Sequence, residues 1–333
     1  MSTEKTVAIE TRTHWIGVDL GGTKILAVVY DDQFQPIGRA RKKTKAREGV
    51  EAGLKRVRDV IDEAMKGAQV VASQVKGLGI GVPGPLDYDK RIVRVAPNLG
   101  WKNVPIAEYL ERHFDFPVVL NNDVDAGVFG EYKFGAGKNA RCLVGIFPGT
   151  GIGGGCVYEG RLLRGTNWSC MEIGHIPLVP AGPLDGAGNP GSLEGMASRL
   201  AISGLAAQAA YRGQAPNLLN IAGTDLASIR SGQIAAAIKK GDKSIEDIVD
   251  QACHYLAMGV VTVVHLLGPN VIVFGGGLVE ELGDLMLPQI EKIARKRILP
   301  SLRDVFKICP AKLGDDAGVR GAAALAQQAL EAI

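Results

Sequence analysis

Three glycine-rich turns follow three apolar runs of this 333-residue chain. They are Gly21-Gly22-Thr23-Lys24, Gly149-Thr150-Gly151 and Gly275-Gly276-Gly277. Phosphate groups bind where backbone N–H donors come close to them, which glycine permits, and a threonine hydroxyl supplies a further donor. A single turn of this kind is an ordinary hairpin, but three of them at three strand ends indicate a phosphate-binding site.

A carboxylate stands just before the first turn, at Asp19. A carboxylate next to a phosphate is repulsive unless a cation lies between them. We therefore expect Mg²⁺ near Asp19, bound through water.

The sequence Asn121-Asn122-Asp123 ends a short apolar run. Asp123 is suited to accept a proton from a substrate hydroxyl, and the neighbouring amide to orient that hydroxyl. The same residues also suit an Asx turn that caps the next helix. From these residues alone, both interpretations stay open.

A second polar group lies in a Gly/Pro-rich segment, where Glu172 and His175 frame Gly174 and Glu194 follows nineteen residues after the histidine. Together with Asn98 they form a set suited to the hydroxyl groups of a sugar. The alternative is a loop held by its own polar contacts.

Two common nucleotide motifs can be checked directly. The Walker pattern G-x-x-x-x-G-K-[ST] does not occur. G-x-G-x-x-G occurs at 79–84, where Pro83 and Pro85 interrupt it, and at 149–154, where a strand-like segment follows. A dinucleotide fold needs a helix at that point, so a nicotinamide dehydrogenase is disfavoured.

Composition limits the remaining classes. Hydrophobic residues make up 46% and charged residues 22%, as in globular proteins of about two domains at this length. A net charge of +3 is too small to indicate a nucleic-acid or membrane partner. Five scattered cysteines without C-x-x-C, and a polar N-terminus without an apolar signal segment, indicate reduced thiols and a cytoplasmic protein.

The turns and polar groups must be positioned by alternating strands and helices, which predicts an α/β fold with ligands at the carboxyl ends of strands. We expect a loose tail at 1–13 and strands at 15–20, 25–30, 36–44, 76–82, 117–120, 142–147, through 156–158 and at 271–274. We expect helices at 49–66, 106–114, 193–210, 225–239, 244–267, directly after Gly277 and at 317–332.

Three local features add to this outline. Ser244 and Asp247 predict a capping box for the helix at 244–267. The basic run 39–47 lacks interleaved aromatics and indicates a solvated edge strand. Each half opens with strand, Gly-Thr turn, strand, so Thr23 and Thr150 mark a weak duplication 127 residues apart.

These residues resemble the ROK family of bacterial sugar kinases and repressors, most of all its glucokinases. The resemblance covers residue 14 to the end and is carried by WIGVDLGGTKI, GIGVPGPLD (79–87), APNLGW (96–101), LNNDVDAGVFGEY (120–132), GTGIGGGCVYEGRLLRG (149–165), EIGHIPLVP (172–180), GSLEGMAS (191–198) and VIVFGGGL (271–278).

The resemblance implies the actin-like ATPase (ribonuclease H-like) fold, with two α/β domains flanking a cleft. We expect the smaller domain at 14–123 plus 317–333 and the larger one at 124–316. It also implies transfer of the ATP γ-phosphoryl group to a hexose hydroxyl, in a homodimer. Glucose, phosphorylated at its 6-hydroxyl, is the expected substrate, with N-acetylmannosamine, fructose or allose as alternatives, and polyphosphate as the alternative donor.

The resemblance also assigns roles to residues. Asp123 matches the catalytic base. The first two turns match the phosphate-binding turns and Gly275–Gly277 the adenosine turn. The sugar-contacting positions match Asn98, Asn122, Asp123, Glu172, His175 and Glu194.

The chain departs from the family at one motif. Many members carry C-x-C-G-x-x-G-C-x-E, whose cysteines bind zinc together with the histidine of E-x-G-H. Asp185, Ala187 and Ser192 stand at the cysteine positions here. Asp185 and His175 alone cannot complete a four-ligand site, so we predict no structural zinc and a loop held by prolines and hydrogen bonds.

Two further functions are compatible with the family or the fold. One is a sugar-sensing repressor, although only about 13 polar residues precede the first strand, fewer than a DNA-binding helix-turn-helix needs. The other is an actin-like ATPase that acts on a protein. The polar set around His175 favours a small sugar over a protein.

Overall fold

The computed structural model describes residues 12–166 and 170–331, which divide into two compact units. Unit 1 comprises the described residues of 1–130, 165–169 and 315–333, and unit 2 those of 131–164 and 170–314. This division passes after Gly130, inside a helix, whereas the sequence placed the boundary after Asp123. The tail expected at 1–13 lies mostly outside the described residues.

Unit 1 is built on a five-stranded sheet of order β3-β2-β1-β4-β8. The first three strands are antiparallel neighbours, and β4 and β8 run parallel to β1. Their bounds are β1 His14–Leu20, β2 Lys24–Tyr30, β3 Pro36–Lys43, β4 Val75–Val82 and β8 Val118–Asn122. The basic run is indeed an edge strand, with alternately exposed residues along β3.

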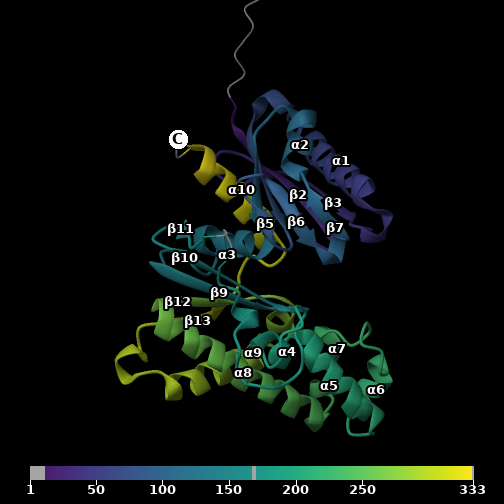
Figure 1. Cartoon of the computed structure of the whole chain (residues 1–333), viewed down its shortest axis with the longest axis vertical. Helices are drawn as coiled ribbons and strands as arrows, with labels where there is room; N and C mark the ends of the chain where they lie inside the picture. Colours follow the sequence, from purple (N-terminus) through teal and green to yellow (C-terminus); the bar gives the residue numbers. More distant parts are fainter. Residues whose placement is uncertain (1–11, 167–169, 332–333) are drawn as a thin grey trace, which may run out of the picture. The chain divides into compact units, whose positions relative to one another are not determined.

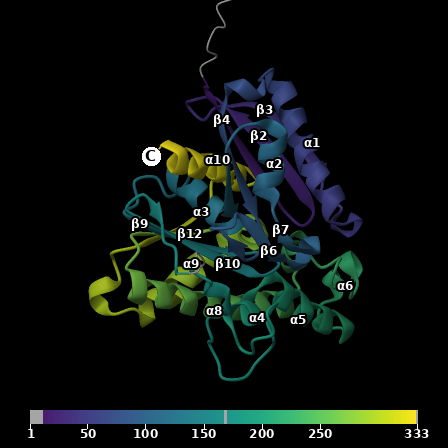
Figure 2. The same ribbon diagram turned by 45° about the horizontal axis from the view of Figure 1, so that its top comes forward.

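Helices cover both faces of this sheet. On one face lie α1 (Val50–Ala68) and α2 (Ile106–Phe114), and on the other lies α10 (Asp316–Glu331), as the two views agree (Figure 1, Figure 2). The α10 helix approaches so closely that a Cβ atom at Gly79 would stand 1.8 Å from the carbonyl oxygen of Ala322. Only glycine fits there, so this strand's glycine-rich sequence reflects helix packing.

A small three-stranded sheet in unit 1 was not expected from the sequence. It consists of β5 (Leu86–Asp87), β6 (Ile92–Ala96) and β7 (Trp101–Val104), in the order β5-β6-β7. Its strands are short and lie among Pro, Gly and charged residues, which carry little periodic signal. The 3₁₀ turn η3 (Pro97–Leu99) that connects β6 to β7 carries Asn98.

Unit 2 repeats the strand arrangement of unit 1. Its sheet has the order β11-β10-β9-β12-β13, with β9 antiparallel to β10, β10 antiparallel to β11, and β12 parallel to both β9 and β13. The bounds are β9 Cys142–Pro148, β10 Ile152–Tyr158, β11 Arg161–Leu162, β12 Val271–Phe274 and β13 Lys307–Pro310. The weak duplication in the sequence therefore corresponds to a repeated sheet topology.

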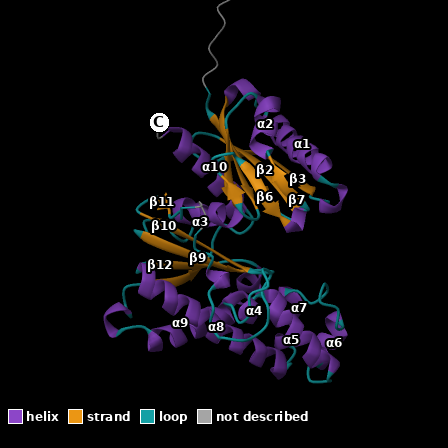
Figure 3. Cartoon of the chain, in the orientation of Figure 1, coloured by secondary structure: helices purple, strands orange, loops and turns teal. Residues whose placement is uncertain are grey.

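The helices of unit 2 gather on one face of its sheet, where α8 and α9 pack side by side (Figure 3). Alternate residues of β9 and β12, such as Ile146 and Phe274, face this core. The helices are α4 Leu193–Ala197, α5 Arg199–Tyr211, α6 Pro216–Ala222, α7 Ser231–Lys239, α8 Lys243–Leu267 and α9 Gly277–Arg297, and α3 (Asp123–Phe134) spans the unit boundary.

Several expected helices differ from those observed. The helix expected at 193–210 is broken at Ser198, whose backbone is extended. The Ser198 hydroxyl caps α5 by accepting the Ala201 N–H. The helix expected at 225–239 begins only at Ser231, and α6 before it was missed. The capping box is wrong: α8 begins after Asp242, and the Ser244 hydroxyl instead donates to the Gln214 carbonyl.

Two simpler features complete the description. All five cysteines carry free thiols. In the described parts of the chain, no helix combines the length and the apolarity that crossing a membrane would require.

Candidate functional site

In unit 1, the parallel strands β1, β4 and β8 bring polar residues to one edge of the sheet. Asp19 is in register with Gly81 of β4, and Gly81 with Asn121 of β8. Gly81 lies on β4, between the strands that lead to the two aspartates. A Cβ atom at Gly81 would lie 3.3 Å from the Cα atom of Asp123, so the absence of a side chain at Gly81 leaves room for Asp123.

The two carboxyl groups influence each other. Burial raises the pKa of Asp19 to about 7, and the charge of Asp123 adds to the rise, while Lys24 opposes it. Two neighbouring carboxyls beside a phosphate-type turn form a donor set suited to a divalent cation, since Mg²⁺ is commonly held by one or two carboxylates with water and phosphate oxygens.

Asp123 is the first residue of α3 and is held by local hydrogen bonds. Its Oδ1 accepts the Val124 N–H at 2.9 Å. The Oδ1 of Asn122 accepts the same N–H at 2.9 Å and that of Asp125 at 3.2 Å. The Asx turn that the sequence offered as the alternative interpretation is therefore present. It fixes the Asp123 carboxyl at the start of α3, and it is compatible with a role of Asp123 as a proton acceptor.

The first glycine turn lies beside these residues within the same unit. The Gly21 N–H donates to the Lys24 carbonyl at 2.9 Å, and the Thr44 hydroxyl donates to the Gly21 carbonyl at 2.6 Å. A Cβ atom at Gly22 would lie 3.3 Å from that of Asn98, so Asn98 packs against the turn. An open pocket next to the turn is lined by Gly22 and residues 45–48.

In unit 2, the structure brings the other two glycine turns together. A Cβ atom at Gly276 would lie 2.9 Å from the carbonyl oxygen of Pro148 and 3.6 Å from the nitrogen of Gly149. Gly276 has φ +82°, a conformation that favours glycine. Gly277 faces the Ser231 hydroxyl at the start of α7.

An arginine that the sequence did not single out completes this corner of unit 2. The guanidinium of Arg199 donates to the Thr150 hydroxyl at 2.7 Å, and its backbone N–H donates to the Gly149 carbonyl at 2.9 Å. Burial lowers the pKa of Arg199, and the charge of Arg230 lowers it further. No carboxylate of the described residues acts on Arg199, which leaves its charge suited to an anion. A lone arginine after a helix cap gave no sequence signal.

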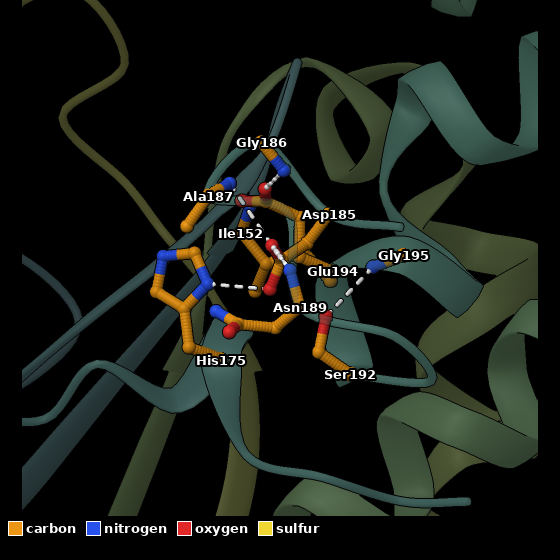
Figure 4. A network of polar contacts seen from close by, with 9 residues as sticks. All are labelled: Ile152, His175, Asp185, Gly186, Ala187, Asn189, Ser192, Glu194 and Gly195. Atoms are coloured by element: carbon orange, nitrogen blue, oxygen red, sulfur yellow. Dashed lines mark hydrogen bonds and ion pairs between the residues drawn. The ribbon is translucent and has the colours of Figure 1, made fainter. Parts of the chain in front are cut away.

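His175 and Glu194 lie near Ile152, the first residue of β10, at the tip of the β9–β10 hairpin (Figure 4). Glu194 accepts the Ile152 N–H at 2.8 Å with one carboxylate oxygen and the Gly186 N–H at 2.9 Å with the other. A Cβ atom at Gly151 would stand 2.2 Å from Glu194 Oε2, so a side chain there would push the carboxylate away from its backbone donors. Glu194 is thus firmly placed by two backbone donors.

The 3₁₀ turn η4 (Ile173–His175) ends at His175, and Glu172 lies exposed just before its start. The Nδ1 atom of His175 lies 2.8 Å from Oδ2 of Asp185. Burial alone would lower the pKa of His175, but the hydrogen bond to Asp185 and the charges of Glu194 and Glu172 outweigh burial and raise it.

The predicted residues therefore form two groups, each gathered within one unit. Those in unit 1 are Asp19, Gly21, Gly22, Thr23, Lys24, Asn98, Asn122 and Asp123. Those in unit 2 are Thr150, Gly151, Gly275, Gly276, Gly277, Glu172, His175 and Glu194. Lys24, which was expected to bind phosphate, forms an ion pair with Asp315, and this carboxylate neutralises the positive charge of the lysine.

A zinc ion does not fit the loop around His175. No cluster of three or more His, Cys, Asp or Glu side chains that could hold a metal occurs within residues 12–166 and 170–331. His175 meets one carboxylate there, and a structural zinc site needs four ligands.

A repeated five-stranded sheet with glycine turns at strand ends is the architecture of the actin-like ATPase fold, and the comparisons agree with it. The ROK family model matches residues 15–329, so the chain belongs to the ROK family. Its fold is the actin-like ATPase fold, which confirms the fold expected from the sequence.

Individual relatives include sugar kinases and a regulator. The glucokinase of Streptomyces coelicolor is 34% identical over 316 residues, which cover 94% of this chain and 97% of that protein. The crystal structure of a ROK family glucokinase from Streptomyces griseus in complex with glucose and AMPPNP is 33% identical with a TM-score of 0.81, covering 95% of this chain and 99% of that one. A xylose repressor of Caldicellulosiruptor bescii is 27% identical over 93% of this chain and 77% of that protein.

Proposed function

We propose that the protein is an ATP-dependent hexose kinase that phosphorylates glucose at its 6-hydroxyl. The observation that carries the proposal is the placement of Asp123 at the start of α3, beside Asp19 and at the edge of the sheet that bears the first glycine turn. Kinase relatives along almost the whole chain support this assignment.

Asp123 acts as the general base in this proposal. It takes the proton of the 6-hydroxyl as that oxygen forms a bond to the γ-phosphorus, and the bond to the β–γ bridging oxygen breaks to release ADP. The cap formed by Asn122 and the Val124 N–H fixes the carboxylate before substrate binds. Fixed geometry of this kind is the main contribution a protein makes to phosphoryl transfer.

The ring hydroxyls of the sugar are assigned to Asn98, Asn122, Glu172, His175 and Glu194. Glu194 is suited to this role because a carboxylate offers about four acceptor sites, of which backbone N–H groups occupy two. The uncharged hexose then donates to the remaining lone pairs.

The phosphates of ATP are assigned to Gly21–Lys24 and to Gly149–Gly151, and the adenosine to Gly275–Gly277. Arg199 supplies a positive charge at the second turn. Mg²⁺, when bound near Asp19, neutralises charge on the transferring phosphate.

Other assignments remain within the same proposal. N-acetylmannosamine, fructose or allose would use the same hydroxyl-binding residues, and polyphosphate the same turns. A sugar-sensing regulator is the second candidate, because the xylose repressor is among the relatives. A homodimer and a cytoplasmic location are retained as proposals.

A coupled assay of ADP formation with a panel of hexoses tests the proposal, with ATP and polyphosphate compared as donors. Glucose with ATP should give the highest kcat/KM. Sugar binding without turnover of any hexose, combined with a shift of DNA fragments on a gel, would support the regulator instead.

A further inference from the structure

Between η4 and α4, the stretch from 180 to 190 is exposed except at one carboxylate. Every residue from 180 to 190 is exposed except Asp185, whose side chain is 0% exposed. A charged side chain is buried in this way only when hydrogen bonds compensate its desolvation.

Asp185 is the centre of the hydrogen bonds within this loop (Figure 4). Its Oδ1 accepts the backbone N–H groups of Ala187 and Asn189, each at 2.9 Å. The Ser192 hydroxyl donates to the same carboxylate. Its Oδ2 lies 2.8 Å from Nδ1 of His175, so one side chain holds both the loop and the ring.

Contact with this carboxylate determines which ring nitrogen of His175 carries the proton. Burial alone would raise the pKa of Asp185, but the hydrogen bonds from His175, Asn189 and Ser192 outweigh burial and hold its pKa well below the usual range. An ionised carboxylate only accepts hydrogen bonds, so Nδ1 of the neutral ring must be the donor. The Nε2 atom is then left as an acceptor, and the His175 side chain is 34% exposed.

We propose that Asp185 is a positioning residue for hexose binding, which holds His175 without a metal ion so that Nε2 accepts a hydrogen bond from a sugar hydroxyl. The identity of the bound sugar rests on the proposed function. The orientation and tautomer of the ring do not, because they follow from the contacts of Asp185 alone.

A matched control exists elsewhere in unit 2. Asp242 is also buried, and its carboxylate also accepts two backbone N–H groups, those of Asn217 and Leu218 at the start of α6, at 3.2 and 2.7 Å. No histidine is among its hydrogen-bond partners. Asp242→Asn therefore shows how much stability is lost when a buried carboxylate that accepts two backbone N–H groups is removed, without an effect on a histidine.

The first test measures the tautomer of the His175 ring by NMR, in the full-length protein labelled with ¹⁵N-histidine and without substrate. At a pH where the ring is neutral, the His175 resonances, assigned with His175→Gln, should show the Nδ1–H tautomer. Asp185→Asn should invert it to Nε2–H, because the new amide donates toward Nδ1. Asp242→Asn should leave it unchanged. An Nε2–H tautomer in the parent, or no change in Asp185→Asn, would overturn the proposal.

The second test separates positioning from folding. Asp185→Asn should raise the KM for hexose about tenfold or more, since a lost hydrogen bond of about 1.4 kcal/mol corresponds to a factor of ten in binding. The KM for ATP and most of kcat should be retained, and Asp242→Asn should change neither KM. A hexose KM within about twofold of the parent would refute the positioning role.

Metal independence is checked on the same preparations. Dialysis against a zinc chelator should leave the hexose KM and the tautomer of the parent unchanged, and elemental analysis should find far less than one zinc per chain. Zinc near one per chain would overturn the metal-free assignment. A parent protein that turns over no hexose would refute the proposed function, while the NMR result would still decide the role of Asp185.

Discussion

The β1–β2 and β9–β10 hairpins occupy the same place in two sheets of the same topology, yet they carry their charges differently. In unit 1 the carboxylate belongs to the hairpin itself, as Asp19 on β1. The residue 127 positions later, Ile146, is fully buried in the core of unit 2. There the carboxylate comes from Glu194 and the positive charge from Arg199, both outside the hairpin.

The turns also differ in length. Four residues separate the paired Leu20 and Ile25, and three separate Pro148 and Ile152. A repeated scaffold therefore places a glycine turn at the end of the same strand in both units, while the length of the turn and the polar side chains around it differ. In the proposed function, unit 1 supplies the general base Asp123 and the carboxylate near the cation, whereas unit 2 supplies the positive charge of Arg199.

Removing the proton acceptor of unit 1 should have the largest effect. Asp123→Asn should lower kcat about a thousandfold, because general-base catalysis typically contributes 10²–10⁴. Folding and glucose binding should persist, since an amide oxygen still accepts the Val124 N–H. Steady-state kinetics and calorimetric binding measure both.

The exposed Asp115 at the end of α2 gives the control, and Asp115→Asn should keep parental kcat. If Asp123→Asn retained turnover within about tenfold of the parent, Asp123 would not be the base.

The second turn should tolerate a methyl group at one end only. Gly151→Ala places a Cβ atom 2.2 Å from Glu194 Oε2, so the carboxylate must move away from its two backbone donors. The substitution should destabilise the protein by roughly 2 kcal/mol and raise the hexose KM. Gly149→Ala meets nothing closer than 4.0 Å and should change stability little. Chemical denaturation of both variants tests this, and equal losses would contradict the crowding at Glu194.

Asp19 should make unit 1 less stable as the pH rises. Its folded pKa of about 7 lies above the ordinary 3.8, so the folded state binds the proton more tightly. Its stabilising effect is complete below about pH 4 and is lost as the pH rises to about 7. Without nucleotide or metal, Asp19→Asn should therefore match the parent near pH 4 and exceed its stability above pH 7 by roughly 4 kcal/mol.

Denaturation curves across this pH range measure the difference. Asp89→Asn, which removes an exposed carboxylate of the same unit, serves as the control. A parallel stability profile for Asp19→Asn and the parent would mean that the Asp19 carboxyl is not desolvated.

Arg199 should matter for ATP and not for sugar. Arg199→Ala should raise the KM for ATP about tenfold, because a charge-assisted contact to phosphate is lost. Arg212→Ala, at the exposed opposite end of α5, is the matched control and should leave the KM for ATP unchanged. An equal ATP KM in both variants would remove Arg199 from the nucleotide site.

Long periodic elements could be predicted closely from the sequence. The regular apolar spacing of α1 and the apolar run of β9 located both within about two residues, because each buries one continuous face. Short elements in polar surroundings, such as β5, β13 and α6, were missed, since they contain too few residues to show a periodic apolar pattern.

The sequence by itself determined the family, the glycine turns and the polar residues that could do chemistry, because residue types and their spacing encode these. Only the tertiary structure decided what those residues contact: that Glu194 reaches the Ile152 N–H, that Arg199 meets Thr150, and that Asp185 holds His175. These partners lie 10 to 49 residues apart along the chain, so their pairing depends on how loops and helices pack. No local sequence pattern encodes that packing.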